Sequence, residues 1–266
     1  MKKRTSTGAA VRQHRTWGRR PWQLVQELRS YYRGCHNRDL REFYDLESHL
    51  PYFDHVSQIL GAHKRRILLT WIGQRPVHGP ILEFGSGIGT FARQLGHRGY
   101  RVVGVDISGA KTRKAQRLTA RQWQEAAPVH HLVGDLRDCG TGTALDLEIL
   151  KVFQQPAPRQ FEVLVAADVL EHIPDPPHET LQRLHTLLAP QGRFFTSVPS
   201  RLGVNDPGHF WRLLPQEWEQ QFIASGFRMQ RRQMSRLCWY GLPTPLPLAM
   251  VYELHPEPPH PHRRLS

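Results

Sequence analysis

The stretch that decides the fold is Ile81-Leu82-Glu83-Phe84-Gly85-Ser86-Gly87-Ile88-Gly89-Thr90. It is an apolar run that carries an acid and leads into three glycines at alternate positions. The glycines allow a sharp turn and let the backbone approach a ligand without an intervening Cβ atom. A helix that starts after such a turn directs its free N–H groups and positive dipole end at the ligand. The stretch predicts a strand at 81–84, a ligand-binding turn, and a helix at 90–96.

A second acid follows at the spacing that a nucleoside requires. Asp106 stands near the end of the apolar run 101–107 and 21 positions after Gly85 (106 − 85). An acid about 20 residues beyond a glycine-rich turn is placed to bind both ribose hydroxyls. Strand, turn, helix, strand and acid in this order predict a nucleoside site, with an empty strand–helix turn as the alternative.

The glycine spacing discriminates between nucleoside cofactors. A dinucleotide fingerprint, G-x-G-x-x-G, needs glycine where this chain has Thr90, and Glu83 would place negative charge beside a pyrophosphate. A sulfonium cofactor with a free ammonium group is a better electrostatic match. The pattern E-x-G-x-G-x-G from Glu83 to Gly89 closely resembles motif I of the class I S-adenosylmethionine-dependent methyltransferases. The resemblance implies S-adenosylmethionine as the cofactor.

The rest of the chain alternates between apolar strands and helices, which predicts a parallel sheet covered by helices on both faces. We expect further strands at 101–106, 129–133, 161–166 and 193–198, and helices at 110–126, 144–153, 179–188 and 215–224. The last two strands, 227–234 and 249–254, are separated by a proline-rich segment and are expected to pair as an antiparallel ribbon at one edge. The fold class is therefore α/β, a doubly wound, Rossmann-like, seven-stranded and mostly parallel sheet with an antiparallel edge strand.

Three more helices are expected before the first strand, at 22–32, 40–50 and 56–71, where this type of fold forms a lid or a substrate wall. The chain is divided accordingly into a basic extension (1–38), a methyltransferase domain (39–255) and a Pro/His-rich tail (256–266). Within the domain we expect a helical wall at 39–75, a cofactor-binding core at 80–200 and a substrate side at 201–255.

The cysteine content and the lengths of the apolar runs indicate the cellular compartment. Cys35, Cys139 and Cys238 are odd in number and form no C-x-x-C pair, which argues against a disulfide framework or a zinc site and for a reducing compartment. No apolar run is long enough to span a bilayer, and no apolar segment of a signal peptide follows the basic N-terminus. We expect a cytoplasmic protein. The sequence does not indicate an oligomeric state.

The formal charge of +13 is concentrated at the N-terminus. Residues 1–38 contain ten Lys or Arg and one acid, Glu27, for a net charge of +9 (10 − 1), with aromatic residues among the arginines. Such an extension is suited to a nucleic acid, through phosphate contacts and base stacking, or to an anionic membrane surface. A solvated tail and an organellar transit peptide are the alternatives.

Asp135 ends the third expected strand, at the edge of the sheet where ligands bind in doubly wound folds. It is placed to accept a hydrogen bond from the exocyclic amine of adenine, while capping of the next turn is the alternative. The expected cofactor-binding residues are Glu83, Gly85, Ser86, Gly87, Gly89, Asp106, Ile107, Asp135, Leu136 and Ala167.

The run from Phe161 to Pro176, FEVLVAADVLEHIPDP, is a second signature. It resembles the motif after strand four in a large methyltransferase group that includes ubiquinone-biosynthesis O-methyltransferases. The later Leu187-Leu188-Ala189-Pro190-Gln191-Gly192 turn resembles the L-x-P-x-G turn of that group, with Gln191 where glycine is usual. The resemblance covers about residues 60–235 and leaves the substrate open.

Three interpretations compete for Asp168, Glu171 and His172. The spacing Asp168-x-x-Glu171 fits a capping box that starts a helix. His172 or Asp168 is alternatively a general base for an acceptor, with His209 nearby. Finally, D-x-x-E-H resembles a metal-binding E-x-x-E-H cluster of RNA 2′-O-methyltransferases and some ubiquinone O-methyltransferases. The expected catalytic residues are His172, Asp168 and His209. A divalent metal is left as a possibility without being assigned, with candidate ligands Asp168, Glu171, His172 and His209.

The sequence thus predicts an S-adenosylmethionine-dependent methyltransferase that acts on a small-molecule acceptor, with oxygen as the expected methyl-accepting atom. A sulfonium methyl group is already activated, so positioning of the acceptor supplies much of the catalysis and no nucleophile triad is required. The alternatives are an RNA-directed methyltransferase that uses the basic extension, an NAD-dependent oxidoreductase, and a catalytically silent cofactor-binding module.

Overall fold

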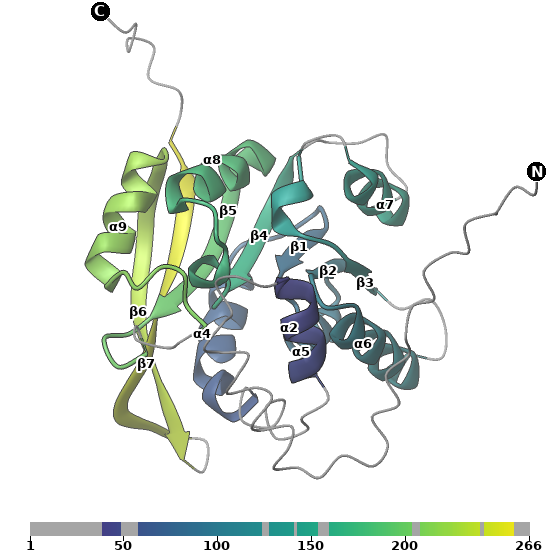
Figure 1. Ribbon diagram of the computed structural model, residues 1–266, viewed down its shortest axis with the longest axis horizontal. Coiled ribbons are helices and arrows are strands. Elements are labelled where there is room, and N and C mark those ends of the chain that lie inside the picture. The colour runs from purple at the N-terminus through teal and green to yellow at the C-terminus, as the bar shows by residue number, and fades with distance from the viewer. Residues whose placement is uncertain are drawn as a thin grey trace, which may run out of the picture.

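The computed structural model describes residues 39–48, 58–123, 128–140, 143–153, 160–203, 208–239 and 242–257. A seven-stranded sheet runs through the molecule in the order β3-β2-β1-β4-β5-β7-β6 (Figure 1). The expected extension 1–38, its helix at 22–32 and the tail from residue 258 lie outside the described residues, and the division of the chain into domains stays a prediction.

The first five strands are parallel and form the centre of the sheet. They are β1 (Ile81–Phe84), β2 (Val102–Asp106), β3 (Val129–Val133), β4 (Phe161–Ala167) and β5 (Leu188–Pro199). The strand order reverses between β1 and β4, and in doubly wound sheets this reversal opens a crevice at the carboxyl ends of the strands. The sequence had placed the acids Glu83, Asp106 and Asp135 at or just beyond strand ends, and the topology brings these ends together.

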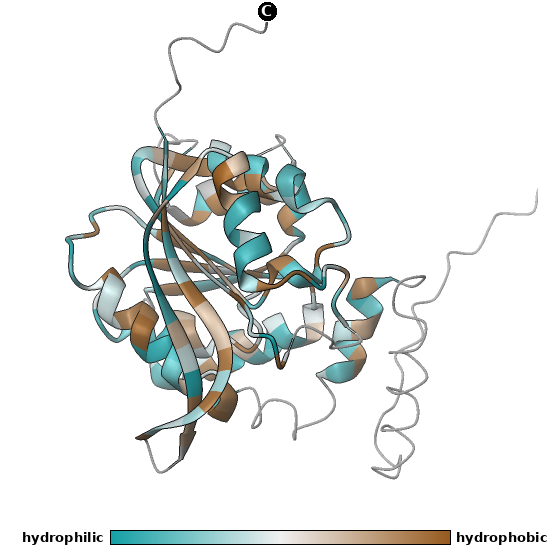
Figure 2. Cartoon of the chain, turned by 90° about the vertical axis from the view of Figure 1, so that its left-hand side faces the viewer, coloured by the Kyte–Doolittle hydropathy of each residue, from teal (hydrophilic) through white to brown (hydrophobic). Residues whose placement is uncertain are grey.

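Helices cover the two faces of this sheet. They are α2 (Leu40–Glu47), α4 (Ala62–Ile72), α5 (Thr90–Gly96), α6 (Gly109–Gln122), α7 (Ala144–Phe153), α8 (Pro177–Leu187) and α9 (Pro215–Ala224). One apolar cluster joins α4 and α5 to the sheet, and a second joins α7, α8 and α9 to it. Figure 2 shows apolar residues along the central strands and mixed polar and apolar residues on the helices.

The fold class expected from the sequence is confirmed, including the antiparallel ribbon at one edge. β7 (Leu242–Pro256) pairs antiparallel with β5, and β6 (Phe227–Trp239) pairs antiparallel with β7. Both strands are longer than expected, because the proline-rich segment continues the ribbon. Proline removes backbone donors without preventing an extended conformation, and it is tolerated where one side of a strand has no partner.

Other boundaries also differ from the expectation for local reasons. The expected helix 56–71 is interrupted at Gly61, a poor helix former: residues 58–60 are helical, and α4 begins at Ala62. α8 begins at Pro177, which suits the first helical turn. α6 ends at Gln122, since Trp123 has an extended backbone conformation. Within the part of the chain that the structure describes, every helix is too short or too polar to cross a membrane.

Candidate functional site

A cavity of about 710 Å³ lies at the carboxyl ends of β1, β2, β3 and β4. Its floor is formed by the turns after these strands, and α2 and α4 form its wall. Pockets for small molecules and cofactors range from roughly 300 to 1,000 Å³, so this cavity has room for a nucleoside cofactor and a small acceptor. All of the expected cofactor residues except Gly89 line it, and Gly89 directly precedes α5.

The glycine turn after β1 has two physical requirements that favour glycine. Gly85 has a φ of +64°, and a Cβ atom there would lie 2.3 Å from Cγ2 of Val169. Gly87 has a φ of +55° but would meet nothing within 4 Å, because it faces open space. Gly85 therefore permits close packing, while Gly87 keeps the turn in the left-handed conformation and leaves its surface accessible to a ligand.

Glu83 is a buried carboxylate next to the glycine turn. Among the described residues its Oε2 has no hydrogen-bond partner. Burial, together with the negative charge of Asp106, raises the pKa of Glu83 to about 8, although Arg65 and Arg93 act in the opposite direction. A buried carboxylate oxygen without a donor is costly unless a ligand supplies one. The site thus fits a ligand that presents a cationic hydrogen-bond donor, such as the ammonium group of S-adenosylmethionine.

Asp106 fixes the glycine turn to the end of β2. Its Oδ2 accepts a hydrogen bond of 2.7 Å from the Gly87 N–H, and its Oδ1 accepts one of 2.9 Å from the Ser108 N–H. An ionised carboxylate offers about four acceptor positions, so two remain for the hydroxyls of a ribose. Burial is the main cause that raises the pKa of Asp106. Ile107, the next residue, is half-buried at the cavity wall.

Asp135 is held by an arginine that the sequence analysis did not identify. Its Oδ1 accepts from the Arg137 main-chain N–H at 2.9 Å, and its Oδ2 accepts from Nε and Nη2 of Arg137 at 2.9 and 2.6 Å. Nη1 of Arg137 lies 3.8 Å from Oδ1 of Asp175, three positions after His172. Arg137 therefore connects the expected adenine end of the cavity to the loop that carries the expected catalytic residues.

The helix α2 closes the cavity over the cofactor side. Asp45 accepts hydrogen bonds from the Ser108 hydroxyl at 2.5 Å and the Ala110 N–H at 2.9 Å, at the start of α6. Tyr44 lies between the two ends of the cavity, with its ring 4.9 Å from Nζ of Lys111 and 6.1 Å from the ring of His172. The expected wall before the first strand is thus attached to α6 by contacts between residues more than 60 positions apart.

Asp168 has an unusual backbone and two strong side-chain partners. Its φ of 55° makes it the single non-glycine residue with positive φ among those described. Its Oδ1 accepts from the Ser197 hydroxyl at 2.6 Å, and its Oδ2 accepts from Nζ of Lys64. The capping-box interpretation is wrong, because Val169 is the N-cap of the short 3₁₀ helix η3 (Leu170–His172) and no side chain caps it. Backbone strain of this kind concentrates at functional sites.

Lys64 is a second residue that the sequence analysis missed. It is buried at the cavity wall, and this burial lowers its pKa to about 8 although Glu171 acts in the opposite direction. The sequence did contain a pattern that could have identified it. Lys64 stands three and four positions before the buried Ile67 and Leu68, on the apolar face of α4, where a lysine is expected to have a specific partner. Its ammonium group joins the helical wall to the loop after β4.

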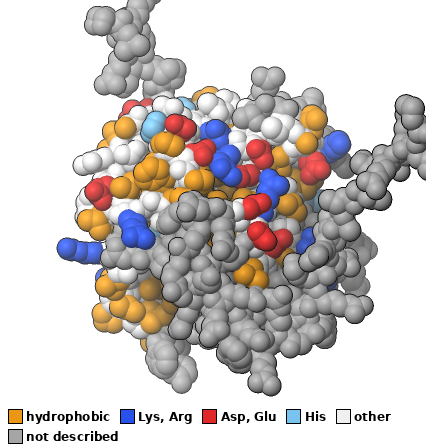
Figure 3. Space-filling view, in the orientation of Figure 1, with side chains coloured by type: hydrophobic (Ala, Val, Ile, Leu, Met, Phe, Trp, Pro, Cys, Tyr) orange, Lys and Arg blue, Asp and Glu red, His pale blue; other side chains and the backbone are white. Residues whose placement is uncertain are grey.

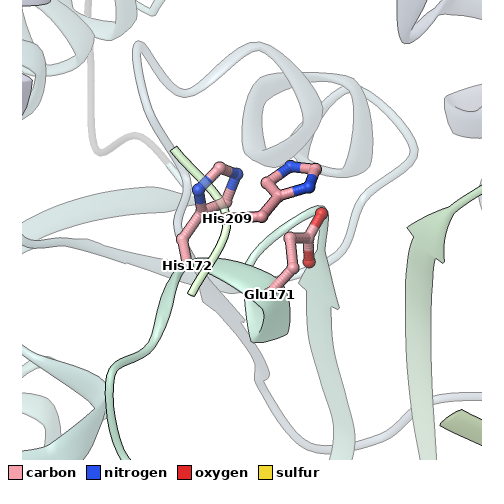
Figure 4. Close-up of side chains that lie close together, drawn as sticks. All are labelled: Glu171, His172 and His209. Atoms are coloured by element: carbon pink, nitrogen blue, oxygen red, sulfur yellow. The ribbon is translucent and has the colours of Figure 1, made fainter. Parts of the chain in front are cut away.

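Glu171, His172 and His209 come together at the other end of the cavity (Figure 4). One ligand-type atom from each lies within 4.8 Å of the others. The loop that carries His209 is joined to η3, since the Phe210 and Trp211 N–H groups donate to the Glu171 carbonyl and Nδ1 of His172 lies 3.0 Å from the Gly208 carbonyl oxygen. Asp168 lies outside this group, with Lys64 and Ser197.

Two imidazoles and a carboxylate form a donor set that divalent metals use. Two ligands on opposite sides of an ion are about 4.2 Å apart at usual metal–ligand distances of about 2.1 Å. The 4.8 Å limit of this group is wider, so the side chains would need to shift inward to hold an ion. The donor types fit a metal better than the spacing does, and the group serves equally as a general base with supporting residues.

Comparison with known proteins agrees with this geometry. The sequence profile of a methyltransferase domain family matches residues 52–239. The chain is 24% identical over 180 residues to the ubiquinone biosynthesis O-methyltransferase of Pseudomonas aeruginosa UCBPP-PA14, covering 66% of this chain and 68% of the relative. It is 25% identical over 190 residues to the protein of that name from Yersinia enterocolitica, covering 70% and 69%.

Solved structures show the same fold at low identity. Magnesium protoporphyrin IX methyltransferase from Synechocystis PCC 6803, solved with bound SAM, superposes with a TM-score of 0.56 and 14% identity over 81% of this chain and 94% of that one. A chain from the Haloferax volcanii complex between the Trm112 methyltransferase activator and a methyltransferase superposes with a TM-score of 0.59 and 15% identity, over 80% and 97%.

Substitution Glu83→Gln is expected to weaken binding of S-adenosylhomocysteine at least about tenfold, because it removes the buried charge that faces the ligand ammonium while keeping the shape. Isothermal titration calorimetry measures the effect. Glu179→Gln, an exposed glutamate in the first turn of α8, is the matched control and should bind as the unchanged protein does. Equal affinity of the Glu83→Gln variant would contradict the assignment.

The raised pKa of Glu83 also predicts a pH dependence. Below a pKa of about 8 the carboxyl group of the ligand-free protein is mostly protonated, and it must ionise to pair with the ammonium group. Affinity for S-adenosylhomocysteine should therefore fall as the pH decreases from 8 to 6, by at most about tenfold per pH unit for one proton. The Glu83→Gln variant should lack this slope. A slope of the same size in the variant would assign the proton to another group.

Arg137→Met is expected to weaken S-adenosylhomocysteine binding by about tenfold, because Asp135 loses the guanidinium group that donates twice to its Oδ2 and orients it. Arg117→Met, an exposed arginine on α6, is the control and should bind as the unchanged protein does. Calorimetry on both variants tests the role of Arg137, and unchanged affinity of Arg137→Met, or an equal loss in the two variants, would refute it.

Proposed function

We propose, from the premise that this chain belongs to the methyltransferase domain family, that it methylates a hydroxyl oxygen of a small-molecule acceptor. It is an S-adenosylmethionine-dependent methyltransferase. The observation that carries the proposal is one cavity with buried acids Glu83, Asp106 and Asp135 at one end and Glu171, His172 and His209 at the other. The cavity volume of about 710 Å³ suits a small acceptor rather than a macromolecular one inserted whole.

Three acids hold the cofactor in this proposal. Glu83 pairs with the ammonium group, Asp106 accepts from the ribose hydroxyls, and Asp135 accepts from the adenine amine. Ser86, the glycines, Ile107, Leu136 and Ala167 form the surfaces between these anchors. When bound, S-adenosylmethionine supplies a methyl group that its sulfonium charge has already activated. The protein supplies position, since α2 and the loop after β4 enclose the ligands from opposite sides.

A hydroxyl acceptor needs its proton removed as the oxygen is methylated. We assign this step to His172. The Nδ1 of His172 lies 3.0 Å from the Gly208 carbonyl, which favours the tautomer with the proton on Nδ1 and the basic electron pair on Nε2. Glu171 and His209 orient and stabilise the ring as it gains a proton, and Lys64 balances the charge of Asp168 at the same end.

The preference for oxygen is supported by the names of the relatives from Pseudomonas and Yersinia, which are O-methyltransferases. A metal held by Glu171, His172 and His209 is the second possibility, favoured by the donor types. Such an ion would bind the acceptor oxygen and lower its pKa.

Family membership does not support the nicotinamide-dependent alternative. The RNA-directed alternative depends on residues 1–38, which lie outside the described residues. The activity test described below distinguishes an enzyme from a catalytically silent binding module. A cytoplasmic location stays a prediction.

The acceptor class is tested by supplying S-adenosylmethionine with an isotopically labelled methyl group. Catechols, simple phenols, carboxylic acids, primary amines and a short RNA are offered in parallel, and labelled products are identified by mass spectrometry. We expect label on the oxygen of a phenol or catechol. Label on RNA or on nitrogen would contradict the proposal, and no label with any acceptor, despite binding of S-adenosylhomocysteine, would favour a silent module.

On the best acceptor of that panel, His172→Gln should lower kcat by roughly 10² or more, the range for loss of a general base, with unchanged affinity for S-adenosylhomocysteine. His178→Gln, an exposed histidine on α8, is the control. Dialysis against a chelator should leave the activity intact. Loss of activity that Mg²⁺ or Zn²⁺ restores would instead assign the histidines to a metal.

A further inference from the structure

Five exposed apolar side chains gather at one end of the molecule, and we call them the apolar rim. Their exposed fractions are 57% for Ile59, 42% for Leu60, 64% for Leu202, 72% for Leu242 and 43% for Leu246. The other large apolar side chains that are exposed in the described part of the chain stand apart on β3, α7 and α9. Contiguous exposed apolar surface on a folded protein usually marks an interaction site.

Hydrogen bonds bring the segments of the rim together. The Arg236 N–H donates to Nδ1 of His63 at 3.0 Å, which places the start of α4 against β6. The Ser200 N–H and hydroxyl donate to the Leu248 and Pro247 carbonyls, both at 3.0 Å, which places the loop of Leu202 against β7. Arg236 and Pro247 face each other across the ribbon, so the rim is one surface rather than scattered residues.

The rim borders the cavity and continues onto a projecting hairpin. Leu60, Gly203 and Leu248 line the cavity, so its acceptor end and the rim share a boundary. β7 pairs with β5 only from Ala249 onward, and residues 242–248 pair with β6 alone. Figures 1 and 2 show this part of the ribbon extending beyond the sheet, and Figure 3 shows hydrophobic side chains gathered at the lower left, where the hairpin lies.

Two exposed arginines flank the rim. Of the four arginines between Glu219 and Glu253, Arg231 and Arg232 form ion pairs with those two glutamates and Arg228 stands at the other end of β6, which leaves Arg236 beside the hairpin. Arg201 and Arg236 are exposed directly beside Leu202 and the hairpin. Apolar side chains next to basic ones are the combination that inserts into the headgroup region of an anionic bilayer, where each basic residue near the surface strengthens binding.

The backbone of the hairpin argues against a protein strand as the partner. Pro243, Pro245 and Pro247 lack N–H groups, so this part of β7 offers few donors for strand addition. We therefore expect docking here to use side chains rather than strand addition. An extended, proline-stiffened hairpin with leucines toward its end is a suitable shape for shallow insertion into a lipid surface.

We propose that the apolar rim, with Arg201 and Arg236, docks this protein onto an anionic lipid bilayer with the acceptor end of the cavity next to the membrane. The two leucines of the hairpin enter the headgroup region, and the arginines contact lipid phosphates. The opposite end of the cavity, with Asp135 and Arg137, then lies away from the bilayer.

The test is co-sedimentation of the full chain with vesicles of phosphatidylcholine plus phosphatidylglycerol, and with vesicles of phosphatidylcholine alone. We expect binding to the anionic vesicles. The double variant Leu242→Glu/Leu246→Glu should lower the partition coefficient at least about tenfold, since it replaces inserted apolar surface with repelled charge. Arg236→Gln should lower it about fivefold. Ile223→Glu, an equally exposed apolar residue on α9, should have no effect.

Calorimetry with S-adenosylhomocysteine verifies that each variant is folded. A variant that binds this ligand normally but does not bind vesicles has lost membrane docking alone, so the two proposals are tested separately. The basic extension 1–38 is present throughout. If it alone carries the binding, the double variant will sediment as the unchanged chain does, and the proposal is overturned. Absence of vesicle binding overturns it as well. Sedimentation velocity without lipid tests whether the rim binds a second copy of the chain. If the chain forms a dimer that the double variant abolishes, and it does not bind vesicles, the rim is a dimer interface and the membrane proposal is wrong.

Discussion

The hydrogen bond from the Gly87 N–H to the Asp106 carboxylate is the contact on which the rest of the site depends. It joins the turn after β1 to the end of β2 and holds the glycine turn beside a buried acid. With Glu83 and Asp135 at the same edge of the sheet, three carboxylates share one cavity. Burying like charges together is unfavourable without a ligand that donates to them. The site therefore fits the proposed ligand, which presents an ammonium group, hydroxyls and an amine.

Hydrogen bonds and ion pairs connect the two ends of the cavity. Arg137 contacts Asp135 at the proposed adenine end and approaches Asp175 in the loop after η3. Lys64 connects the wall helix α4 to Asp168, whose left-handed backbone is held by Ser197. The indole N–H of Trp211 donates to the carbonyls of Ile173 and Asp175, which fixes the loop of His209 to the same segment. These contacts join the residues at the two ends of the cavity into one connected network.

The sequence predicted what depends on local pattern and on strand ends. Apolar runs, glycines and prolines marked the strand 81–84, the helix 90–96 and the antiparallel ribbon. Glu83, Asp106 and Asp135 were expected together because parallel strands end at one edge; they do line one cavity, and their contacts with the cofactor stay a prediction. Lys64, Arg137 and Asp45 were not found, because their partners lie far away in sequence or depend on a side-chain direction. The capping-box interpretation of Asp168 failed for the same reason, since Ser197 and Lys64 outcompete a local cap.

The central claim is that the three carboxylates hold one molecule of S-adenosylmethionine in a defined direction. A crystal structure of the protein with S-adenosylhomocysteine tests this most directly. The account predicts the amino group at Oε2 of Glu83, the ribose hydroxyls at Asp106 and the adenine amine at Asp135, with the sulfur pointing toward His172. Density for the ligand in the reverse direction, or bound outside this cavity, would contradict it.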